Sequence, residues 1–256
     1  MNKQKGFTLI ELLVVISIIA MLMAILMPVL RKAKEQVKLV TCMSNLRQVG
    51  LSADLYTQNN DGFVPRHTDK VNAGAYEWFQ LFMPFISNAP TDGDYSKVKY
   101  FRCPNYPKKE QIVCYSINNW HFTGISDTTG EQGNEGKLKL SAYKRLASTI
   151  YLADNEDGIW RPIITMEPSQ QGEWVRGDVY SQEHLPITDE SILRARAPEW
   201  DKKRDSGPRV AHKRHRQGCN LLFADWHVGY MAAVDLAAKK GGVTNIEAIN
   251  LWRFKK

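Results

Sequence analysis

The apolar positions at the N-terminus form one long run. Between residues 6 and 30 the only charged side chain is Glu11, and about 20 apolar residues are enough to cross a bilayer. A cleaved secretory signal normally has an apolar region of about 7–15 residues followed by a small-x-small cleavage site. This run is longer, and no clear Ala-x-Ala follows it. The pattern therefore favours a membrane-spanning helix over a conventional signal peptide.

After residue 31 the pattern becomes amphipathic. Apolar residues recur at intervals of three and four, which places them on one face of a helix. They are Leu39, Cys42, Leu46, Val49, Ala53 and Tyr56. A turn-favouring Asn-Asn-Asp-Gly cluster follows at 59–62. We expect one helix over residues 7–58, about 75–80 Å long, with residues 7–30 in the membrane and residues 31–58 packed on a soluble domain.

Residues 59–256 indicate a globular α+β domain. A short aromatic segment at 76–82 is expected to be helical. Candidate strands are 99–103, 112–117, 148–153, 159–165, 219–223 and 227–231. Because no sustained βαβ alternation is present, we expect an antiparallel sheet. The polar stretch at 168–209 is expected to be an insertion or long surface loop, with a short helix at 189–197.

Composition narrows the class of protein. The 256 residues carry a formal net charge of +7 and are 43% hydrophobic, which is too polar for a polytopic membrane protein. The basic run at 213–216 lacks interleaved aromatic residues for stacking on bases. We therefore expect a solvated cationic surface there and no specific nucleic-acid partner.

Glu11 is the unusual residue of the apolar run. A charge near the centre of a membrane helix costs roughly 2.5–3.5 kcal/mol. Glu11 lies four residues after Phe7, on the same helical face. If the chain were cut after Gly6, the new α-amine of Phe7 could neutralise Glu11 in its own chain or in a neighbour. The alternative is that Glu11 lies near the lipid headgroups at little cost.

The segment Lys5-Gly6-Phe7-Thr8-Leu9-Ile10-Glu11, with its basic leader and apolar run, resembles the prepilin cleavage and methylation motif of type IV pilins and type II secretion pseudopilins. The resemblance implies a leader at 1–6, cleavage between Gly6 and Phe7 by a prepilin peptidase, and N-methylation of Phe7. It implies a single-pass inner-membrane protein with a cytoplasmic N-terminus and an exported C-terminal domain. It also implies assembly with other pilin-like subunits on an inner-membrane platform, into a periplasmic or cell-surface filament, and it places Pro28 where such helices often kink.

The densest group of chemically versatile side chains lies near the C-terminus. It comprises His212, His215, Cys219, Asp225 and His227. Imidazole and thiolate groups suit zinc, but the spacing matches no standard zinc signature. A hairpin of strands 219–223 and 227–231 explains the pattern more simply, with Leu221 and Phe223 buried. In that hairpin Asp225 caps the turn and His215 hydrogen-bonds to it, so we favour a structural hairpin over a metal site.

This segment also resembles the H-X9-DG signature of one branch of prepilin-like proteins. His215 and Asp225 match the signature, whereas Trp226 replaces its Gly. Other matching positions are Gly218, Asn220, Phe223, Ala224, His227 and Val228. The stretch 42–50 resembles the C-x-x-N-L-R-Q-x-G helix of that branch, and Cys103-Pro104 resembles its Cys-Pro strand end. The signature carries no established chemistry, so His215, Asp225 and His227 are expected to be structural.

The four cysteines allow three complete pairings, and the sequence does not choose among them. Cys103 and Cys114 enclose a short loop and are the favoured disulfide, which would add about 3 kcal/mol. Cys42 and Cys219 are then expected to be buried thiols.

A second candidate cation site is acidic. Asp154, Glu156 and Asp157 precede Gly158 and offer the oxygen ligands that calcium prefers. Their spacing does not follow an EF-hand loop, so we expect a solvated acidic turn. No bound cofactor is predicted, with zinc and calcium kept as alternatives.

No complete catalytic motif is present. We therefore expect a structural subunit of a type IV pilus-like or type II secretion pseudopilus filament, not an enzyme. The alternative is a membrane-anchored exported enzyme, or a metal- or ligand-binding domain that uses the cluster between His212 and His227.

Overall fold

The structure is a computed structural model of the 256-residue chain. It describes residues 7–65, 78–89, 97–106, 111–121, 131–132, 137–156, 178–179, 185–186, 210–211, 214–237, 239–240 and 243–253. The leader at 1–6, the candidate strand at 159–165, the candidate helix at 189–197 and most of the stretch 168–209 lie outside the described residues.

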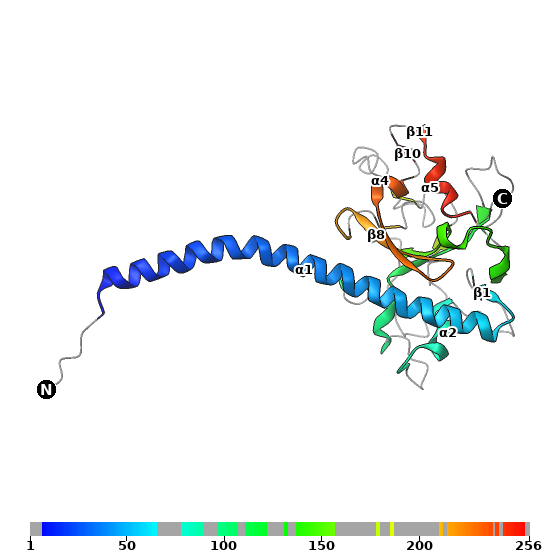
Figure 1. The fold of residues 1–256 in the computed structure, drawn as a ribbon, viewed down its shortest axis with the longest axis horizontal. Helices are drawn as coiled ribbons and strands as arrows, with labels where there is room; N and C mark the ends of the chain where they lie inside the picture. Colours follow the sequence, from blue (N-terminus) through cyan, green and yellow to red (C-terminus); the bar gives the residue numbers. More distant parts are fainter. Residues whose placement is uncertain are drawn as a thin grey trace, which may run out of the picture.

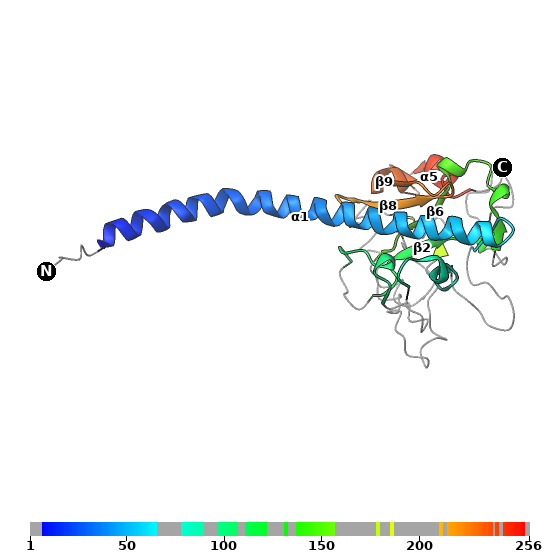
Figure 2. The same ribbon diagram turned by 60° about the horizontal axis from the view of Figure 1, so that its bottom comes forward.

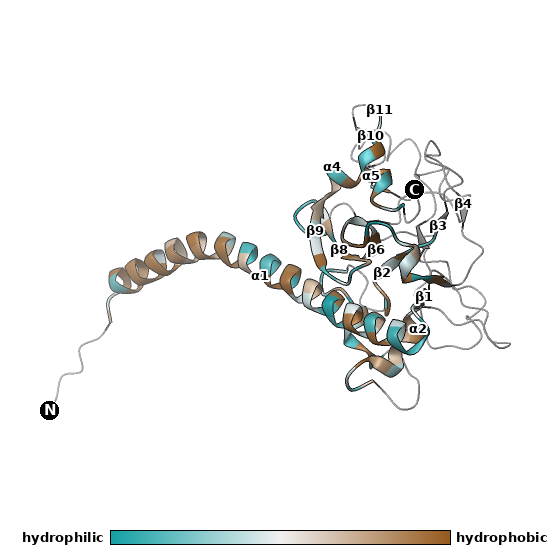
Figure 3. Ribbon diagram, turned by 45° about the vertical axis from the view of Figure 1, so that its right-hand side comes forward, coloured by the Kyte–Doolittle hydropathy of each residue, from teal (hydrophilic) through white to brown (hydrophobic). Residues whose placement is uncertain are grey.

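A single long helix, α1, extends from Leu9 to Asn59. Its first half projects away from the rest of the protein as a curved rod (Figure 1). Pro28 lies inside the helix, where it removes one backbone hydrogen bond. The projecting half is long and apolar enough to cross a membrane, and its apolar window is fully exposed. Figure 3 shows this half as predominantly hydrophobic, whereas the second half alternates between hydrophobic and hydrophilic residues.

The second half of α1 packs on the globular domain. All six residues of the predicted seam are buried, from Leu39 to Tyr56, so the amphipathic prediction is confirmed. At Gly50 the helix lies close against the sheet, since a Cβ there would lie 2.9 Å from Leu222 Cδ1 and 3.2 Å from the Trp226 carbonyl oxygen. After Asn59, Asp61 and Gly62 adopt positive φ values of 53° and 78°, as the predicted turn requires.

The core of the domain is a five-stranded sheet with the order β7-β2-β6-β8-β9. Its strands are β2 (Tyr115–Asn118), β6 (Ile150–Asp154), β7 (Asp178–Val179), β8 (Gly218–Phe223) and β9 (Val228–Ala232). The pairs β2–β6, β6–β8 and β8–β9 are antiparallel, as expected. The predicted α+β fold with an antiparallel sheet is therefore confirmed, and one edge pair, β2–β7, is parallel. A long connection separates these two strands, which allows them to run in the same direction.

The sheet is covered on both faces. Successive residues of β8 point to opposite sides, so Leu222 joins the core beneath α1 while Leu221 and Phe223 join a second core. That second core also contains Leu236 and Ile249, from the helices α4 (Ala233–Leu236) and α5 (Ile246–Asn250). Figure 2 shows β8 and β9 between α1 and α5.

Shorter elements complete the described fold. The strands are β1 (Phe63–Pro65), β3 (Trp120–His121), β4 (Glu131–Gln132), β5 (Lys137–Lys139), β10 (Lys239–Lys240) and β11 (Val243–Thr244), which pair as β1–β5, β3–β4 and β10–β11. The helical pieces are α2 (Trp78–Phe82), which confirms the aromatic helix, and the 3-10 turns η1 (Met83–Phe85), η3 (Lys99–Phe101), η4 (Leu140–Ala142) and η5 (Leu146–Ser148).

One strand prediction within the described residues is wrong. Residues 99–103 form η3 and an extended end instead of a strand. The segment lies against α1, where the Asn45 side-chain amide donates a 2.8 Å hydrogen bond to the Arg102 carbonyl. A helix side chain thus satisfies a backbone group that a strand would have paired with a neighbour.

Candidate functional sites

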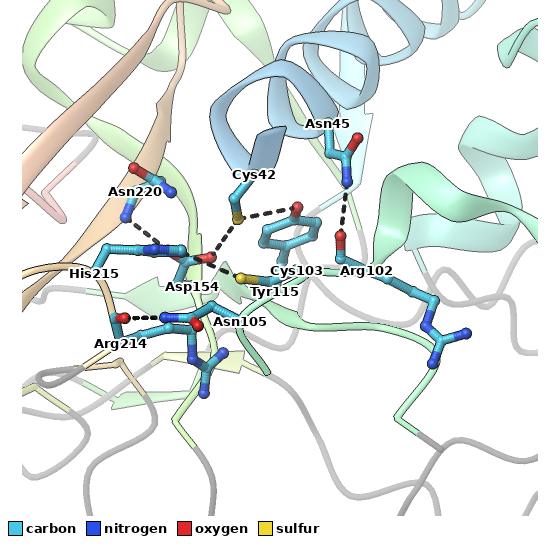
Figure 4. Close-up of polar contacts among 10 residues, drawn as sticks. All are labelled: Cys42, Asn45, Arg102, Cys103, Asn105, Tyr115, Asp154, Arg214, His215 and Asn220. Carbon is cyan, nitrogen blue, oxygen red and sulfur yellow. Dashed lines mark hydrogen bonds and ion pairs between the residues drawn. The ribbon is translucent and has the colours of Figure 1, made fainter. Parts of the chain in front are cut away.

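Four ligand-type side chains meet where α1 crosses the sheet. Cys42 lies on the packed face of α1, Cys103 follows η3, Asp154 ends β6, and His215 precedes β8. All four are buried, and one ligand atom from each lies within 4.8 Å of the others. Figure 4 shows their side chains converging from these four segments. We call this group the Cys-Asp-His cluster.

Short polar contacts join the members of the Cys-Asp-His cluster. Cys42 Sγ donates to Asp154 Oδ1 at 3.3 Å, and Cys103 Sγ lies 3.2 Å from His215 Nε2. His215 Nε2 lies 3.5 Å from Asp154 Oδ2. The backbone N–H of Asn220 also donates to Asp154 Oδ2, at 2.7 Å. The carboxylate is therefore fixed from both oxygens.

Polar side chains around the cluster hold its segments in place. The Asn105 side-chain amide donates to the Arg214 carbonyl, next to His215, and Lys38 Nζ donates to Asn105 Oδ1 at 3.2 Å. Asn105 thus ties the loop of Cys103 to both α1 and the loop of His215. The His215 backbone pairs with Gly218 across a two-residue turn, in which Arg216 and Gln217 have positive φ values of 47° and 63°. A two-residue turn of type I′ requires positive φ at both central residues.

Burial and mutual contact shift the acidity of the cluster. Burial raises the pKa of the Cys42 thiol well above its usual value. The neighbouring Cys42 thiol and then His215 outweigh burial at Cys103, and they lower its pKa to about 5. Burial, followed by the charge of Cys103, raises the pKa of Asp154 to about 6. Arg214, buried with its guanidinium 4.2 Å from the centre of the Tyr106 ring, brings a positive charge that acts on both Cys103 and Asp154.

These contacts correct several predictions. All four cysteines are free, so the predicted Cys103–Cys114 disulfide is absent from the structure, and the Cys103 sulfur contacts His215 instead. Asp154 is fully buried at the end of a strand, so it does not belong to a solvated acidic turn. Arg214 and His215 are also buried, because the turn before β8 folds this basic run back against the sheet.

The predicted hairpin is present, but its histidine–aspartate pairing differs from the expectation. Asp225 caps the turn by accepting a 3.2 Å hydrogen bond from the His227 N–H, as predicted. Its side-chain partner is His227, whose Nδ1 lies 2.5 Å from Asp225 Oδ1. His215 instead faces Asp154. Trp226, in the position of the signature Gly, has a φ of +70°, so the turn keeps the backbone geometry that glycine favours.

The start of α1 is the second candidate site. Thr8 is the N-cap residue, and it forms a capping box with Glu11. Glu11 Oε2 accepts hydrogen bonds from the Thr8 N–H at 2.8 Å and from the Thr8 hydroxyl at 2.7 Å, while the Glu11 N–H donates to Thr8 Oγ1 at 3.3 Å. Phe7 is exposed directly before this box. Gly6 lies outside the described residues.

Comparison with known proteins identifies this N-terminal region. Residues 1–27 match the family described as the prokaryotic N-terminal methylation motif. The type IV wide pilus major component of Thermus thermophilus is 34% identical over 74 residues, which cover 29% of this chain and 56% of that protein. Together these matches support a prepilin-type, pilin-like protein. The match thus spans little more than half the length of the relative, and no solved structure matches the chain.

Local signals for both candidate sites are present in the sequence. Residue spacing by itself, however, did not group the residues of either site. The capping box follows the S/T-x-x-E pattern, which Thr8 and Glu11 match. In the Cys-Asp-His cluster, Cys42, Cys103 and His215 come from three separate segments that resemble motifs of the H-X9-DG branch. Asp154 immediately follows a predicted buried strand, but no motif joined it to the other three.

Proposed function

We propose that the protein is a structural subunit of a type IV pilus-like or type II secretion pseudopilus filament. The observation that carries the proposal is the exposed apolar half of α1 together with the methylation motif at its start. Apolar side chains from Leu9 to Leu30 lie exposed, and an apolar surface of this extent must be covered by lipid or by other proteins. A bilayer covers it before assembly, and neighbouring helices cover it in the filament.

The proposal includes processing of the precursor. A prepilin peptidase cleaves between Gly6 and Phe7, and N-methylation then modifies the Phe7 amine. The leader stays on the cytoplasmic side, and the globular domain is exported. The match to the methylation motif supports this order of events, and the exposure of Phe7 supports access of the modifying enzyme.

Glu11 is proposed to guide docking. The capping box uses Oε2 of Glu11, and Oε1 has no hydrogen-bond partner among the described residues. That oxygen can therefore accept the ammonium group of a processed Phe7, in its own chain or in a neighbour, while the box stays intact. Pairing two charges in a medium of low dielectric constant lowers the cost of burying both.

The test separates processing from assembly. Gly6→Val is expected to leave unprocessed precursor, which the intact mass and N-terminal sequence of the purified subunit measure. Glu11→Val is expected to leave cleavage normal and to prevent incorporation into sheared filaments, which immunogold labelling measures. Glu35→Val is the matched control, because Glu35 is exposed on the same helix after the apolar run. A Glu11→Val subunit that enters filaments at the wild-type level would overturn the docking role.

A further inference from the structure

We propose that Cys42, Cys103, Asp154 and His215 form a closed, tetrahedral zinc site that fastens α1 to the sheet. The site is distinct from the filament-forming half of α1, and it does not depend on the proposed function. It differs from the metal site considered at 212–227 because His215 is the only member that the two sets share.

The geometry of the cluster suits a tetrahedral ion. One ligand atom from each side chain lies within 4.8 Å of the others. Cys42 Sγ lies 3.3 Å from Asp154 Oδ1, and Cys103 Sγ lies 3.2 Å from His215 Nε2. His215 Nε2 lies 3.5 Å from the other carboxylate oxygen, Asp154 Oδ2. Zinc bonds of about 2.3 Å to sulfur and about 2.0–2.2 Å to nitrogen and oxygen give tetrahedral edges of about 3.3–3.8 Å. A rotation of the Asp154 carboxylate that directs one oxygen to the ion, with small shifts of the other ligand atoms, would let the four side chains surround one zinc ion.

The chemistry of the donors selects the metal. Two thiolates, one imidazole and one carboxylate are ligands that zinc binds readily. Calcium takes six to eight oxygen ligands, and this cluster offers oxygen from Asp154 alone. Zinc is therefore the ion that matches the set.

The surroundings balance the charge and orient the ligands. With two thiolates and a carboxylate, a bound Zn²⁺ leaves one net negative charge, which the buried Arg214 guanidinium offsets. The Asn220 N–H holds Asp154 Oδ2, and the Tyr115 hydroxyl lies 3.7 Å from Cys42 Sγ. Groups that orient metal ligands in this way are a regular feature of zinc sites.

The burial of all four ligands indicates a structural role. Catalytic zinc sites keep a position open for water or substrate, whereas structural sites are closed by four protein ligands. Here the ligands come from α1, the segment after η3, β6 and the turn before β8. One ion would hold α1 and three segments of the globular domain together. The site would therefore resist a force that pulls the domain away from α1.

A disulfide between Cys42 and Cys103 is the competing chemistry, because it would use the same two sulfur atoms. Such a bond would not explain why Asp154 and His215 lie so close to the two sulfur atoms. The zinc site explains the convergence of all four side chains, and both cysteines are free thiols in the structure.

The first experiment uses the full chain, extracted from membranes in detergent without chelators. Mass spectrometry of metals should find about one zinc per chain, as four-ligand structural sites bind one ion. Cys42→Ser and His215→Ala should reduce zinc to background. Cys219→Ser and His227→Ala are the matched controls and should keep it, because Cys219 is a buried cysteine and His227 a histidine outside the cluster.

The second experiment keeps the wild-type chain, so that loss of metal through misfolding of a variant does not decide the result. Zinc is exchanged for Co²⁺ under reducing conditions, and the visible spectrum should show the intense absorption of a tetrahedral cobalt–thiolate centre. A chelator should lower the melting temperature of the wild type and leave that of Cys42→Ser unchanged. A folded, reduced wild-type chain that takes up neither zinc nor cobalt would overturn the proposal, as would a native Cys42–Cys103 disulfide with no metal uptake after reduction.

Discussion

His215 and His227 lie in the same stretch of the chain, and each pairs with an aspartate, but the surroundings of the two pairs differ completely. The pair of His215 and Asp154 is buried, with side-chain exposures of 1% and 0%. The pair of His227 and Asp225 lies at the hairpin turn, with exposures of 46% and 33%. The shorter contact belongs to the exposed pair. Burial, and not distance, therefore decides which pair matters for stability.

The physical reason is the cost of leaving a buried group unpaired. Around Asp154 no water can replace a lost partner, so the remaining groups bear the full cost of desolvation. Around Asp225 water replaces the partner, and exposed ion pairs contribute about 0–1 kcal/mol. Three comparisons of variants test this difference, and a fourth tests the hairpin turn next to the exposed pair.

The largest expected effect comes from the two aspartates. Asp154→Ala should lower the free energy of unfolding by about 3–5 kcal/mol, because it leaves buried partners of a charged group unpaired. Asp225→Ala should cost about 1 kcal/mol or less, through the exposed pair and the turn cap. Denaturant unfolding of the full chain in detergent, followed by tryptophan fluorescence, measures both. Equal losses would remove the distinction between the pairs.

Replacing the buried histidine should also destabilise the protein more than replacing the exposed one, but the difference between the two losses should be smaller than for the aspartates. His215→Ala should cost about 1–3 kcal/mol as a lost buried hydrogen-bond partner. His227→Ala should cost about 1 kcal/mol or less, although it also removes the stacking of the imidazole on Phe223, whose ring centre lies 4.3 Å away. Melting temperatures under one buffer condition provide the comparison. A larger drop in melting temperature for His227→Ala than for His215→Ala would contradict the conclusion that burial decides the contribution of each pair.

A double-mutant cycle tests which aspartate is the partner of His215. The coupling energy between His215→Ala and Asp154→Ala should be about 0.5–3 kcal/mol, as for residues in contact. The coupling between His215→Ala and Asp225→Ala should be within about 0.5 kcal/mol of zero, because no contact joins those residues. A strong coupling of His215 with Asp225 would instead support the pairing expected from the sequence.

The smallest net effect is expected at Trp226. Trp226→Gly relieves a positive φ of +70°, which costs about 1–2 kcal/mol for a residue with a Cβ. The substitution also removes the edge-to-face contact with Tyr151, whose ring centre lies 5.3 Å away, and such pairs contribute about 0.5–1.5 kcal/mol. The two effects oppose each other, so the melting temperature should change little. Trp226→Ala is the control, because it loses the ring without gaining the freedom of glycine, and it should be the less stable variant.

Much of the fold follows from local patterns. The seam from Leu39 to Tyr56 was predictable because helical spacing alone places these residues on one face. The β8–β9 hairpin was predictable because two apolar stretches flank a short turn. The segment at 99–103 was not, because its backbone partner is the Asn45 side chain from a distant helix. The parallel pairing of β7 likewise depends on a long connection and carries no local signal.

The sequence by itself determined the anchor, the methylation motif and the face of α1 that packs, because each depends on residues close together along the chain. Only the tertiary structure decided what happens where α1 meets the sheet. The pairings favoured from the sequence were Cys103 with Cys114 and His215 with Asp225, in each case the nearer candidate along the chain. Folding instead brings Cys42, Cys103, Asp154 and His215 together from four separate segments. Their partners depend on how α1 crosses the sheet, and the close approach at Gly50 helps to set that crossing. No spacing along the chain encodes it.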